Sequence, residues 1–556
     1  MAPVSVVVIP ARDEQGAIAT CLEALARQTV GTGAFEVIVV ADACRDDTEA
    51  AARRAATRLG LSVTIIPGPG AGSGAARRVG MDAAAARLES LGQPHGLIAS
   101  TDADSTPAED WLERQLGHVA RGAEVVAGLI ELDPADAARL PDPVVRRRER
   151  DARRRLTDVT AREPAAQHHH FAGASLGVTA QTYRSVGGLE GRVALEDEAF
   201  AAKLANRGVA VLRPSDVRVR TSARIDGRAR RGLSVDLAVS MWREQRRYRA
   251  CDFEPEAVRA AKAATTVSVV LPAKDCARTI AGVLETTVAP ATGAGLVDEV
   301  IVVDAASRDG TAACAAEAGA VVVQQDELLP EYGPALGKGD AMWRALHRSR
   351  GDVVCFLDAD TEDPHPDHLL GLLGPLLEHP DIALVKGAFE RPFRAGERTL
   401  PHEGGRVTEV MARPLLNLHF PLLAGFDQPL AGEFGARRDL LTRMSFPVGY
   451  GVEIAVLIDA LSLCGLQVLA ECHVGTRQNR HQPLRALGEM AFAVLAATER
   501  RIEGSPRSVT GGQYLRPWEE DPMVRVPIDE RPPLTRRDAD QRSGERSRDC
   551  VSSATD

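Results

Sequence analysis

The sequence predicts an α/β protein with two tandem domains, each built on a sheet of mainly parallel strands. The chain has 556 residues, more than one hydrophobic core usually supports. A Val-rich strand ending in Pro-Ala and a later Asp-Ala-Asp triplet occur together twice, with the triplets at 102–104 and 358–360. Apolar runs of strand length alternate with stretches of helical spacing, which is typical of parallel sheets covered by helices.

Both halves begin with the same order of elements, a strand, a helix and a second strand. These elements are expected at 4–9, 18–26 and 36–40 in the first half and at 267–271, 280–287 and 299–303 in the second. Ligands of such sheets bind beyond the carboxyl ends of the strands, where the Pro-Ala turns and the Asp-Ala-Asp triplets fall. The repeated motifs are therefore expected at a binding edge.

The composition divides the chain into four segments. We expect the first domain over 1–232, a charged helical linker over 233–264, the second domain over 265–502 and a tail over 503–556. The tail is rich in Pro, Arg, Asp and Ser, and it has too few apolar residues to offset the entropy of ordering. We therefore expect the tail to be disordered.

Charge and cysteine content exclude several classes of protein. The formal net charge of −10 argues against general nucleic-acid binding, which needs a basic face. Nine cysteines are scattered without a Cys-x-x-Cys pair and no leader opens the chain, so we expect reduced thiols and a cytoplasmic protein. No apolar run reaches the roughly 18 to 20 residues of a transmembrane helix. An oligomer is compatible with all of these features.

The motifs of the second half describe a pocket for a nucleotide sugar. Asp304 ends a strand, where a carboxylate can accept hydrogen bonds from a uracil or a ribose. Lys338 lies between two glycines, which let the chain approach a sugar nucleotide closely. Asp358 and Asp360 follow a buried strand and can hold a divalent cation against a diphosphate. Asp-x-Asp turns also occur by chance, so the order of the motifs is what favours this function.

A second group of residues suggests a site for an anion. Gly404 and Gly405 open a predicted helix that has Arg406 and Thr408 in its first turn. Backbone N–H groups, a guanidinium and a hydroxyl form a compact receptor for phosphate or carboxylate. An ordinary helix start with an exposed arginine would show the same pattern. Further on, Glu453 follows a glycine-rich turn and can grip sugar hydroxyls.

Over about residues 265–500, these motifs resemble glucosyl-3-phosphoglycerate synthase, a retaining glycosyltransferase family with the Rossmann-like GT-A fold. The strings Gly-Gly-Arg-Val-Thr-Glu from 404 and Gly-Tyr-Gly-Val-Glu-Ile from 449 are the specific part of this resemblance. It implies transfer of glucose from UDP-glucose to 3-phosphoglycerate, with Mg²⁺ or Mn²⁺ as cofactor. It assigns UDP-glucose and the metal to Pro272, Asp304, Lys338, Asp358 and Asp360, the phosphoglycerate to Gly405, Arg406 and Thr408, the glucose to Glu453, and a place near the reacting centre to the carbonyl of Leu430.

Two positions depart from the pattern of that family. Cys276 stands where the family has a glutamate, and Asn479 stands where it has a metal-binding histidine. An amide oxygen binds transition metals less well than imidazole but suits magnesium, so Asn479 is a candidate metal ligand, with His481 as the alternative. Either the chemistry persists with a changed metal preference, or the acceptor has changed.

The first half resembles the broad inverting GT-A family. The resemblance implies a nucleotide sugar on Pro10, Asp42 and Asp102, and a metal ion on Asp104. In that family the Asp of a Glu-Asp pair is the general base that takes the proton of the acceptor hydroxyl, which points to Asp197. An acidic helix start is the other explanation for this pair.

Two further clusters of the first half have ordinary explanations. The histidines at 168–170 are consecutive and cannot all face one ion on a regular element, so the lining of an acceptor pocket is favoured over a metal site. The arginine-rich run at 146–155 can contact an anionic acceptor, but a solvated helix face is the commoner reason for such a run.

The sequence as a whole favours a bifunctional glycosyltransferase. Its second half would glucosylate 3-phosphoglycerate or a similar small anion, and its first half would transfer a sugar to an unknown acceptor. In one alternative, one half is a degenerate module that binds a nucleotide sugar without turnover. In another, both halves act on a different glycoconjugate.

Overall fold

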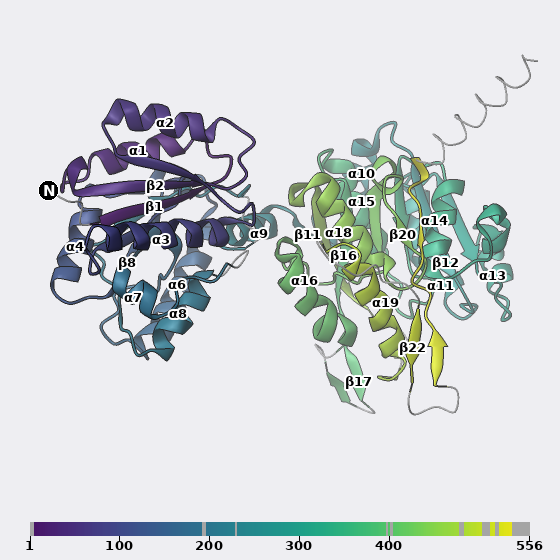
Figure 1. Ribbon diagram of the computed structural model, residues 1–556. Helices are drawn as coiled ribbons and strands as arrows, with labels where there is room; N and C mark the ends of the chain where they lie inside the picture. Colours follow the sequence, from purple (N-terminus) through teal and green to yellow (C-terminus); the bar gives the residue numbers. More distant parts are fainter. Residues whose placement is uncertain are drawn as a thin grey trace, which may run out of the picture. The chain divides into compact units, whose positions relative to one another are not determined.

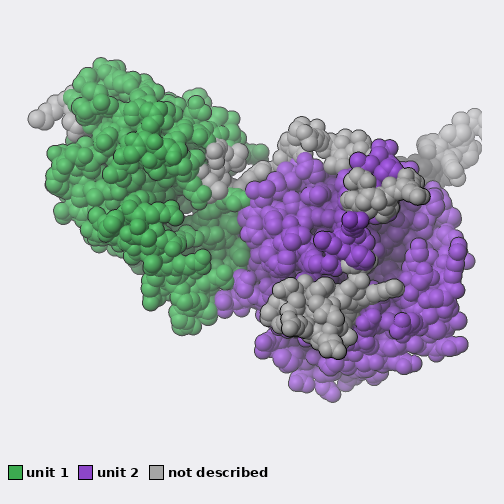
Figure 2. Space-filling model, turned by 90° about the horizontal axis from the view of Figure 1, so that it is seen from below, with its two compact units in different colours: residues 1–241 green, residues 242–556 purple. Residues whose placement is uncertain are grey.

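The computed structural model describes residues 5–191, 196–227, 231–395, 398–400, 404–477, 483–502, 512–516 and 522–535. The chain forms two compact units, residues 1–241 and 242–556, which Figure 2 shows in different colours. Each unit has its own main sheet with helices packed on it (Figure 1). None of the described helices is both long enough and apolar enough to span a bilayer.

The main sheet of the first unit has the strand order β3-β2-β1-β4-β8-β6-β9, and β8 runs antiparallel to both of its neighbours. These strands are β1 (Ser5–Ala11), β2 (Phe35–Ala41), β3 (Val63–Pro67), β4 (Leu97–Ser100), β6 (Val125–Ala127), β8 (Leu176–Thr179) and β9 (Val211–Leu212). A small sheet joins β5 (Ser105–Pro107), β10 (Arg218–Thr221) and β7 (Leu129–Leu132).

β1 is buried along its whole length because helices cover both faces of the first sheet. Val7 and Ile9 pack with α1 and α2, whereas Val6 and Val8 pack with α3. In Figure 1, α1 and α2 lie on one side of β1 and β2, and α3 lies on the other. The helices are α1 (Ile18–Ala26), α2 (Thr48–Leu59), α3 (Ser73–Ser90), α4 (Trp111–Ala120), α5 (Pro134–Ala137), α6 (Asp142–Thr160), α7 (Ala180–Ser185), α8 (Glu196–Asn206) and α9 (Leu233–Gln245).

The second unit repeats this topology and adds one strand. Its sheet has the order β14-β13-β12-β15-β19-β16-β21-β11, and β19 occupies the antiparallel place of β8. The prediction of two tandem α/β domains with parallel-dominated sheets is therefore confirmed. The strands are β11 (Arg247–Arg249), β12 (Val267–Ala273), β13 (Glu299–Asp304), β14 (Val321–Gln324), β15 (Val353–Phe356), β16 (Leu384–Glu390), β19 (Phe434–Arg437) and β21 (Leu469–Thr476).

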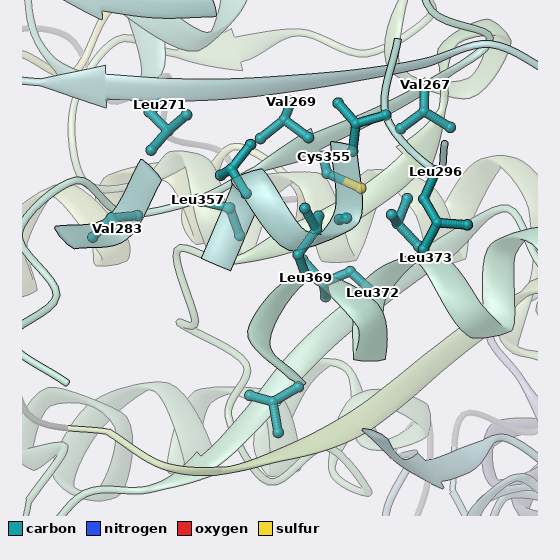
Figure 3. Close-up of a cluster of buried hydrophobic side chains, with 14 of the residues drawn as sticks. Val267, Val269, Leu271, Val283, Leu296, Cys355, Leu357, Leu369, Leu372 and Leu373 are labelled. Carbon is teal, nitrogen blue, oxygen red and sulfur yellow. The ribbon is translucent and has the colours of Figure 1, made fainter. Parts of the chain in front are cut away.

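The core of the second unit lies between β12 and its helices. Figure 3 shows Val267, Val269 and Leu271 of β12 close to Leu369 and Leu372 of α15, and all five side chains are buried. The helices of this unit are α10 (Pro255–Lys262), α11 (Ile280–Val283), α12 (Ala289–Gly293), α13 (Thr311–Glu317), α14 (Lys338–Arg348), α15 (Asp367–Glu378), α16 (Arg413–His419), α17 (Arg438–Leu441), α18 (Val452–Cys464) and α19 (Leu487–Glu499).

The segment expected to be a helical linker, residues 233–264, contains a strand of the second sheet. β11 pairs with β21, and the indole of Trp242 donates a hydrogen bond to the carbonyl of Leu469 at 2.7 Å. The ring of Trp242 also lies 4.3 Å from that of Phe426. Residues from Trp242 onward are therefore part of the second unit.

The structure differs from the expected disorder at 512–516 and 522–535. Here β22 (Gln513–Leu515) pairs with β23 (Met523–Arg525), and β24 (Glu530–Arg531) pairs with β20 (Phe446–Pro447). Val526 and Ile528 are buried against α19, and the indole of Trp343 donates to the carbonyl of Pro532 at 2.8 Å. Composition is a poor guide here because a few buried side chains hold the segment. The remainder of the predicted tail lies outside the described residues.

Arg531 in this segment closes a buried ion cluster. Its guanidinium donates to both carboxylate oxygens of Asp340, at 2.8 and 2.7 Å, and Arg344 contacts the same carboxylate at 3.0 Å. We expect Arg531→Ala to lower the free energy of unfolding of the second unit by about 3 kcal/mol, because Asp340 would remain buried with one partner fewer. Denaturant unfolding measures this. Arg525→Ala, at an exposed position of β23, is the control, and equal midpoints for the two variants would contradict the expectation.

Candidate active site

A cavity of about 560 Å³ opens beyond the carboxyl ends of β12, β13 and β15. Segments far apart in the sequence meet in it, so it unites the predicted donor residues with the predicted anion receptor. The site residues that line it are Pro272, Lys338, Asp358, Asp360, Gly405, Arg406, Thr408, Leu430 and Glu453. Asn479, the third predicted metal ligand, and His481 lie outside the described residues.

Lys338 is the central cation of this cavity. It is the first residue of α14, and its Nζ lies 2.6 Å from Asp358 Oδ1 and 2.9 Å from Glu453 Oε1. Burial lowers the pKa of Lys338, but the two carboxylates outweigh burial and raise the pKa above its ordinary value. The amine is therefore charged, and it ties the Asp-Ala-Asp triplet to the start of α18.

Asp358 and Asp360 differ in their electrostatic surroundings. Burial raises the pKa of Asp358, but Lys338 and Arg477 outweigh it and hold this pKa well below the usual range. Burial and then the neighbouring Asp358 raise the pKa of Asp360. Two carboxylates facing one cavity offer the oxygen ligands that Mg²⁺ and Mn²⁺ prefer. The pair therefore fits a divalent cation.

Asp304 is buried at the end of β13, between Val303 and Ala305, which both line the cavity. Its Oδ2 accepts a hydrogen bond from the backbone N–H of Ser307 at 3.2 Å. Its Oδ1 has no hydrogen-bond partner among the described residues. A buried acceptor without a donor is costly, so this oxygen suits an N–H or O–H group of a ligand.

The backbone around Gly432 approaches the charged centre closely. A Cβ atom at this position would lie 2.3 Å from Lys338 Nζ and 2.4 Å from Asp358 Oδ1. No side chain fits between these atoms, which explains a glycine here. At the anion receptor, Gly405 has a φ of 68° and thus the left-handed conformation that glycine favours.

Sequence reasoning missed two arginines of the cavity. Arg391 follows the end of β16 and Arg477 follows the end of β21, and both guanidinium groups lie over the ring of Phe389, at 4.9 and 5.3 Å. Arg477 is buried, forms an ion pair with Glu433 and lies 3.7 Å from Asp358 Oδ2. Their positions just after strand ends were the signal that could have identified them.

Cys276 occupies the place that Glu14 has in the first domain. The backbone N–H of each donates to a threonine hydroxyl, Thr311 at 2.8 Å and Thr48 at 2.7 Å. Cys276 lines the cavity, and burial raises the pKa of its thiol to about 11. The second site thus has a neutral group where the first has a carboxylate.

In the first domain, Arg77 has the bridging role of Lys338. Its guanidinium is buried, 2.7 Å from Asp102 Oδ1 and 3.3 Å from Glu196 Oε1. It also donates to the hydroxyl of Ser100 at 2.6 Å and to the carbonyl of Gly173 at 3.0 Å. One cation therefore joins the Asp-Ala-Asp triplet to the start of a later helix in both domains.

The other predicted catalytic groups of the first domain lie near this centre. Arg224 contacts Asp104 Oδ2 at 3.0 Å and pairs with Glu14 through two hydrogen bonds, at 3.0 and 2.6 Å. Burial and then Asp102 raise the pKa of Asp104 to about 6. Burial and then Glu196 raise the pKa of Asp197. Pro10 is buried in β1, opposite Val40 of β2.

Asp42 of the first domain is not the structural equivalent of Asp304 in the second. Ala11 at the end of β1 pairs with Ala41, whereas Ala273 at the end of β12 pairs with Asp304. Asp42 therefore comes one residue later. Its carboxylate accepts the backbone N–H groups of the following loop, Gly70 at 2.6 Å and Gly72 at 3.0 Å, so it shapes this loop.

Two of the three consecutive histidines hold backbone segments together. The ring of His168 contacts the carbonyl of Pro214 at 3.2 Å, and His170 Nδ1 accepts the N–H of Ile130 at 3.3 Å. Burial lowers their pKa values, to about 4 for His168 and about 3 for His170, so both rings are neutral. In the described part of the chain, no three His, Cys, Asp or Glu side chains gather into a metal site.

Comparison with known proteins agrees with two related domains. The family described as glycosyl transferase family 2 matches residues 6–179 and 268–423. Glucosyl-3-phosphoglycerate synthase of Mycolicibacterium smegmatis is 42% identical over 280 residues, 50% of this chain and 92% of that protein. The enzyme of the same name from Petrotoga mobilis is 39% identical over 248 residues, 43% of this chain and 76% of its own.

Solved structures of similar sequence include mannosyl-3-phosphoglycerate synthase from Rubrobacter xylanophilus, with 41% identity, a TM-score of 0.47, and coverage of 53% of this chain and 97% of that one. Glucosyl-3-phosphoglycerate synthase from Mycobacterium tuberculosis, solved with Mn²⁺, UDP-glucose and phosphoglyceric acid, has 41% identity, a TM-score of 0.46, and coverage of 51% and 95%. The family match over both halves shows that the chain belongs to glycosyl transferase family 2, and its second half resembles glucosyl-3-phosphoglycerate synthase.

Proposed function

We propose that the second domain transfers glucose from UDP-glucose to 3-phosphoglycerate or a similar small anion. The observation that carries this proposal is that one cavity holds both the donor residues around Lys338 and Asp358 and the anion receptor of Arg406 and Thr408. The named activity of the relatives, which are about two-fifths identical to this chain over the aligned residues, supports the same reaction.

We assign the donor to one side of the cavity. Asp304, with one carboxylate oxygen lacking a donor, suits the base or ribose of the nucleotide. Asp358 and Asp360, with Asn479 as a further ligand, would hold Mg²⁺ or Mn²⁺, which neutralises charge on the departing diphosphate. Lys338 adds a second positive charge beside the same group.

The acceptor site follows from the helix start at Gly405. Backbone N–H groups, the guanidinium of Arg406 and the hydroxyl of Thr408 would bind the phosphate or carboxylate of the acceptor. This places the acceptor hydroxyl inside the cavity that also holds the sugar. Binding of both partners in one cavity supplies the proximity that group transfer needs.

A retaining transfer needs no strong protein base when the leaving diphosphate takes the proton of the acceptor on the same face. Glu453 fits this scheme because Lys338 holds its Oε1 in the lining of the cavity, where the carboxylate can accept a hydrogen bond from a sugar hydroxyl. The carbonyl of Leu430, in the lining of the cavity, would lie near the anomeric carbon.

For the first domain we propose a separate, inverting transfer with Asp197 as the general base and with Pro10, Asp42 and Asp102 near the donor. The raised pKa of Asp197 supports this role, because a base works best when its pKa approaches the working pH. Asp102 and Asp104 each pair with an arginine, Arg77 and Arg224, so this pair of carboxylates fits a metal ion less well.

The full chain with UDP-glucose, 3-phosphoglycerate and Mg²⁺ or Mn²⁺ tests the assignment through UDP release. We expect Asp360→Ala to lower kcat/KM by roughly 1,000-fold, because it removes several kcal/mol of charge stabilisation from the leaving group. Asp104→Ala is the matched control in the other domain and should leave this reaction unchanged. A normal rate for Asp360→Ala would rule out catalysis by the second domain.

A further inference from the structure

Two fully buried ionisable side chains, a lysine and a glutamate, occupy neighbouring strands outside the lining of the cavity. Lys386 of β16 and Glu471 of β21 are register partners on neighbouring parallel strands, and they are 0% and 1% exposed. Lysine and glutamate are almost never buried to this extent unless they are paired, because moving each charge out of water costs several kcal/mol. Neither residue is among those that line the cavity. We therefore expect these two side chains to act on residues that do line the cavity.

Both side chains hold the same loop, residues 427–432. Glu471 Oε1 accepts the backbone N–H groups of Asp427 and Gln428, at 2.8 and 3.1 Å. Lys386 Nζ donates to the carbonyl of Ala431, and it lies 5.1 Å from the centre of the Phe434 ring. Glu471 thus holds the amide end of the loop, and Lys386 holds the carbonyl end. Burial raises the pKa of Glu471 to about 7, and its Oε1 accepts the two N–H groups in either protonation state.

This loop carries the parts of the backbone that approach the reacting centre. Leu430 and Gly432 both line the cavity, and Gly432 lies against Lys338 and Asp358 with no room for a Cβ atom. Ala431, which Lys386 holds, is the residue between them. A shift of the loop by a fraction of an ångström would displace the carbonyl of Leu430 or push Gly432 into the charged pair.

The choice of lysine fits this geometry. The sequence has 67 basic residues but only five lysines, at positions 203, 262, 274, 338 and 386. A compact ammonium group can point at a single carbonyl in a closed space, whereas a planar guanidinium with five donors cannot be satisfied there. Burial lowers the pKa of Lys386 to about 8, which still leaves the amine mostly protonated at pH 7.

We propose that Lys386 and Glu471 are positioning residues that clamp the loop 427–432 from its two ends and so set the geometry of the sugar transfer. The proposal rests on the glucosyl transfer assigned to the second domain. It predicts that loss of the clamp lowers kcat while the affinity for UDP-glucose changes little, because Pro272 and Asp304 belong to other strands, β12 and β13, and stay in place.

The test compares Lys386→Met and Glu471→Met with wild type in the full chain. We expect kcat to fall about 10- to 100-fold, the loss typical of a misplaced reacting group, with KM for UDP-glucose within about threefold. Hydrogen exchange of the amides of 427–432 should be faster in both variants. Lys262→Met, which removes an ion pair with Asp298 in the same domain, is the control for a purely structural effect.

Unchanged kcat and unchanged exchange in a folded Lys386→Met protein would overturn the clamp. A rise of KM as large as the fall of kcat would also overturn it, because that result indicates general damage to the donor site. An inactive wild type would instead refute the glucosyl transfer. The exchange rates of 427–432 would then still decide whether the two residues hold the loop.

Discussion

Replacing Lys338 with methionine should lower the rate of UDP release by at least about 1,000-fold while leaving the first domain folded. Methionine has nearly the same length, so the change removes charge more than volume. The variant leaves the carboxylates of Asp358 and Glu453 without the cation that lies between them. Breaking a buried pair in this way costs about 3 to 5 kcal/mol, and the diphosphate also loses a positive charge.

Steady-state kinetics with saturating metal ion measures this effect. Lys203→Met is a control in the first domain, where this lysine pairs with Glu190 at 3.7 Å and donates to the carbonyl of Gly188 at 2.9 Å. A loss confined to KM would indicate that Lys338 only helps to bind the donor. Activity close to wild type would show that the bridge between the triplet and α18 is not needed for the reaction.

Adding one methyl group at Gly432 should lower kcat by about 100-fold or more with little change in overall secondary structure. The new Cβ atom would lie within 2.4 Å of both Lys338 Nζ and Asp358 Oδ1, so either the loop or the ion pair must move. Such overpacking costs about 1 to 3 kcal/mol, and here the displaced atoms are those that meet the substrate.

Gly293→Ala provides the control for this variant. Gly293 ends α12 in the same domain, and a Cβ atom there would have no neighbour within 4 Å. This control should keep full activity and a slightly raised stability, because alanine restricts the unfolded chain more than glycine does. If Gly432→Ala behaved like Gly293→Ala, the close approach seen at Gly432 would not exist in solution.

The sequence predicted best those features that local patterns determine. The strand-end motifs at Pro272 and Asp358 lie where the alternation of strands and helices placed them, beyond the carboxyl ends of β12 and β15. Both halves also share their strand order. These features depend on residues close together in the chain, so short-range patterns of apolar residues and glycines predict them well.

The sequence predicted poorly what depends on contacts between distant segments. Arg477 reaches Asp358 because the end of β21 faces the same cavity as the end of β15, and Lys386 reaches Ala431 in the loop before the neighbouring strand β19. The order of residues 522–535 likewise depends on Asp340, a buried carboxylate far away in the chain that needs Arg531. No spacing rule connects such partners, because tertiary packing brings them together.

The two bridging cations come from positions one helical turn apart. Lys338 is the first residue of α14, after Gly337, whereas Arg77 is the fifth residue of α3, after the equivalent Gly72, and Ser73 takes the place of the lysine. A turn of helix advances about 5.4 Å, and the longer guanidinium spans that distance back to the carboxylates. An alignment of the two halves places Ser73 opposite Lys338 and therefore does not show that the positive charge is kept. Both domains thus keep a positive charge beside the Asp-Ala-Asp triplet, although the residue type and its position in the helix differ.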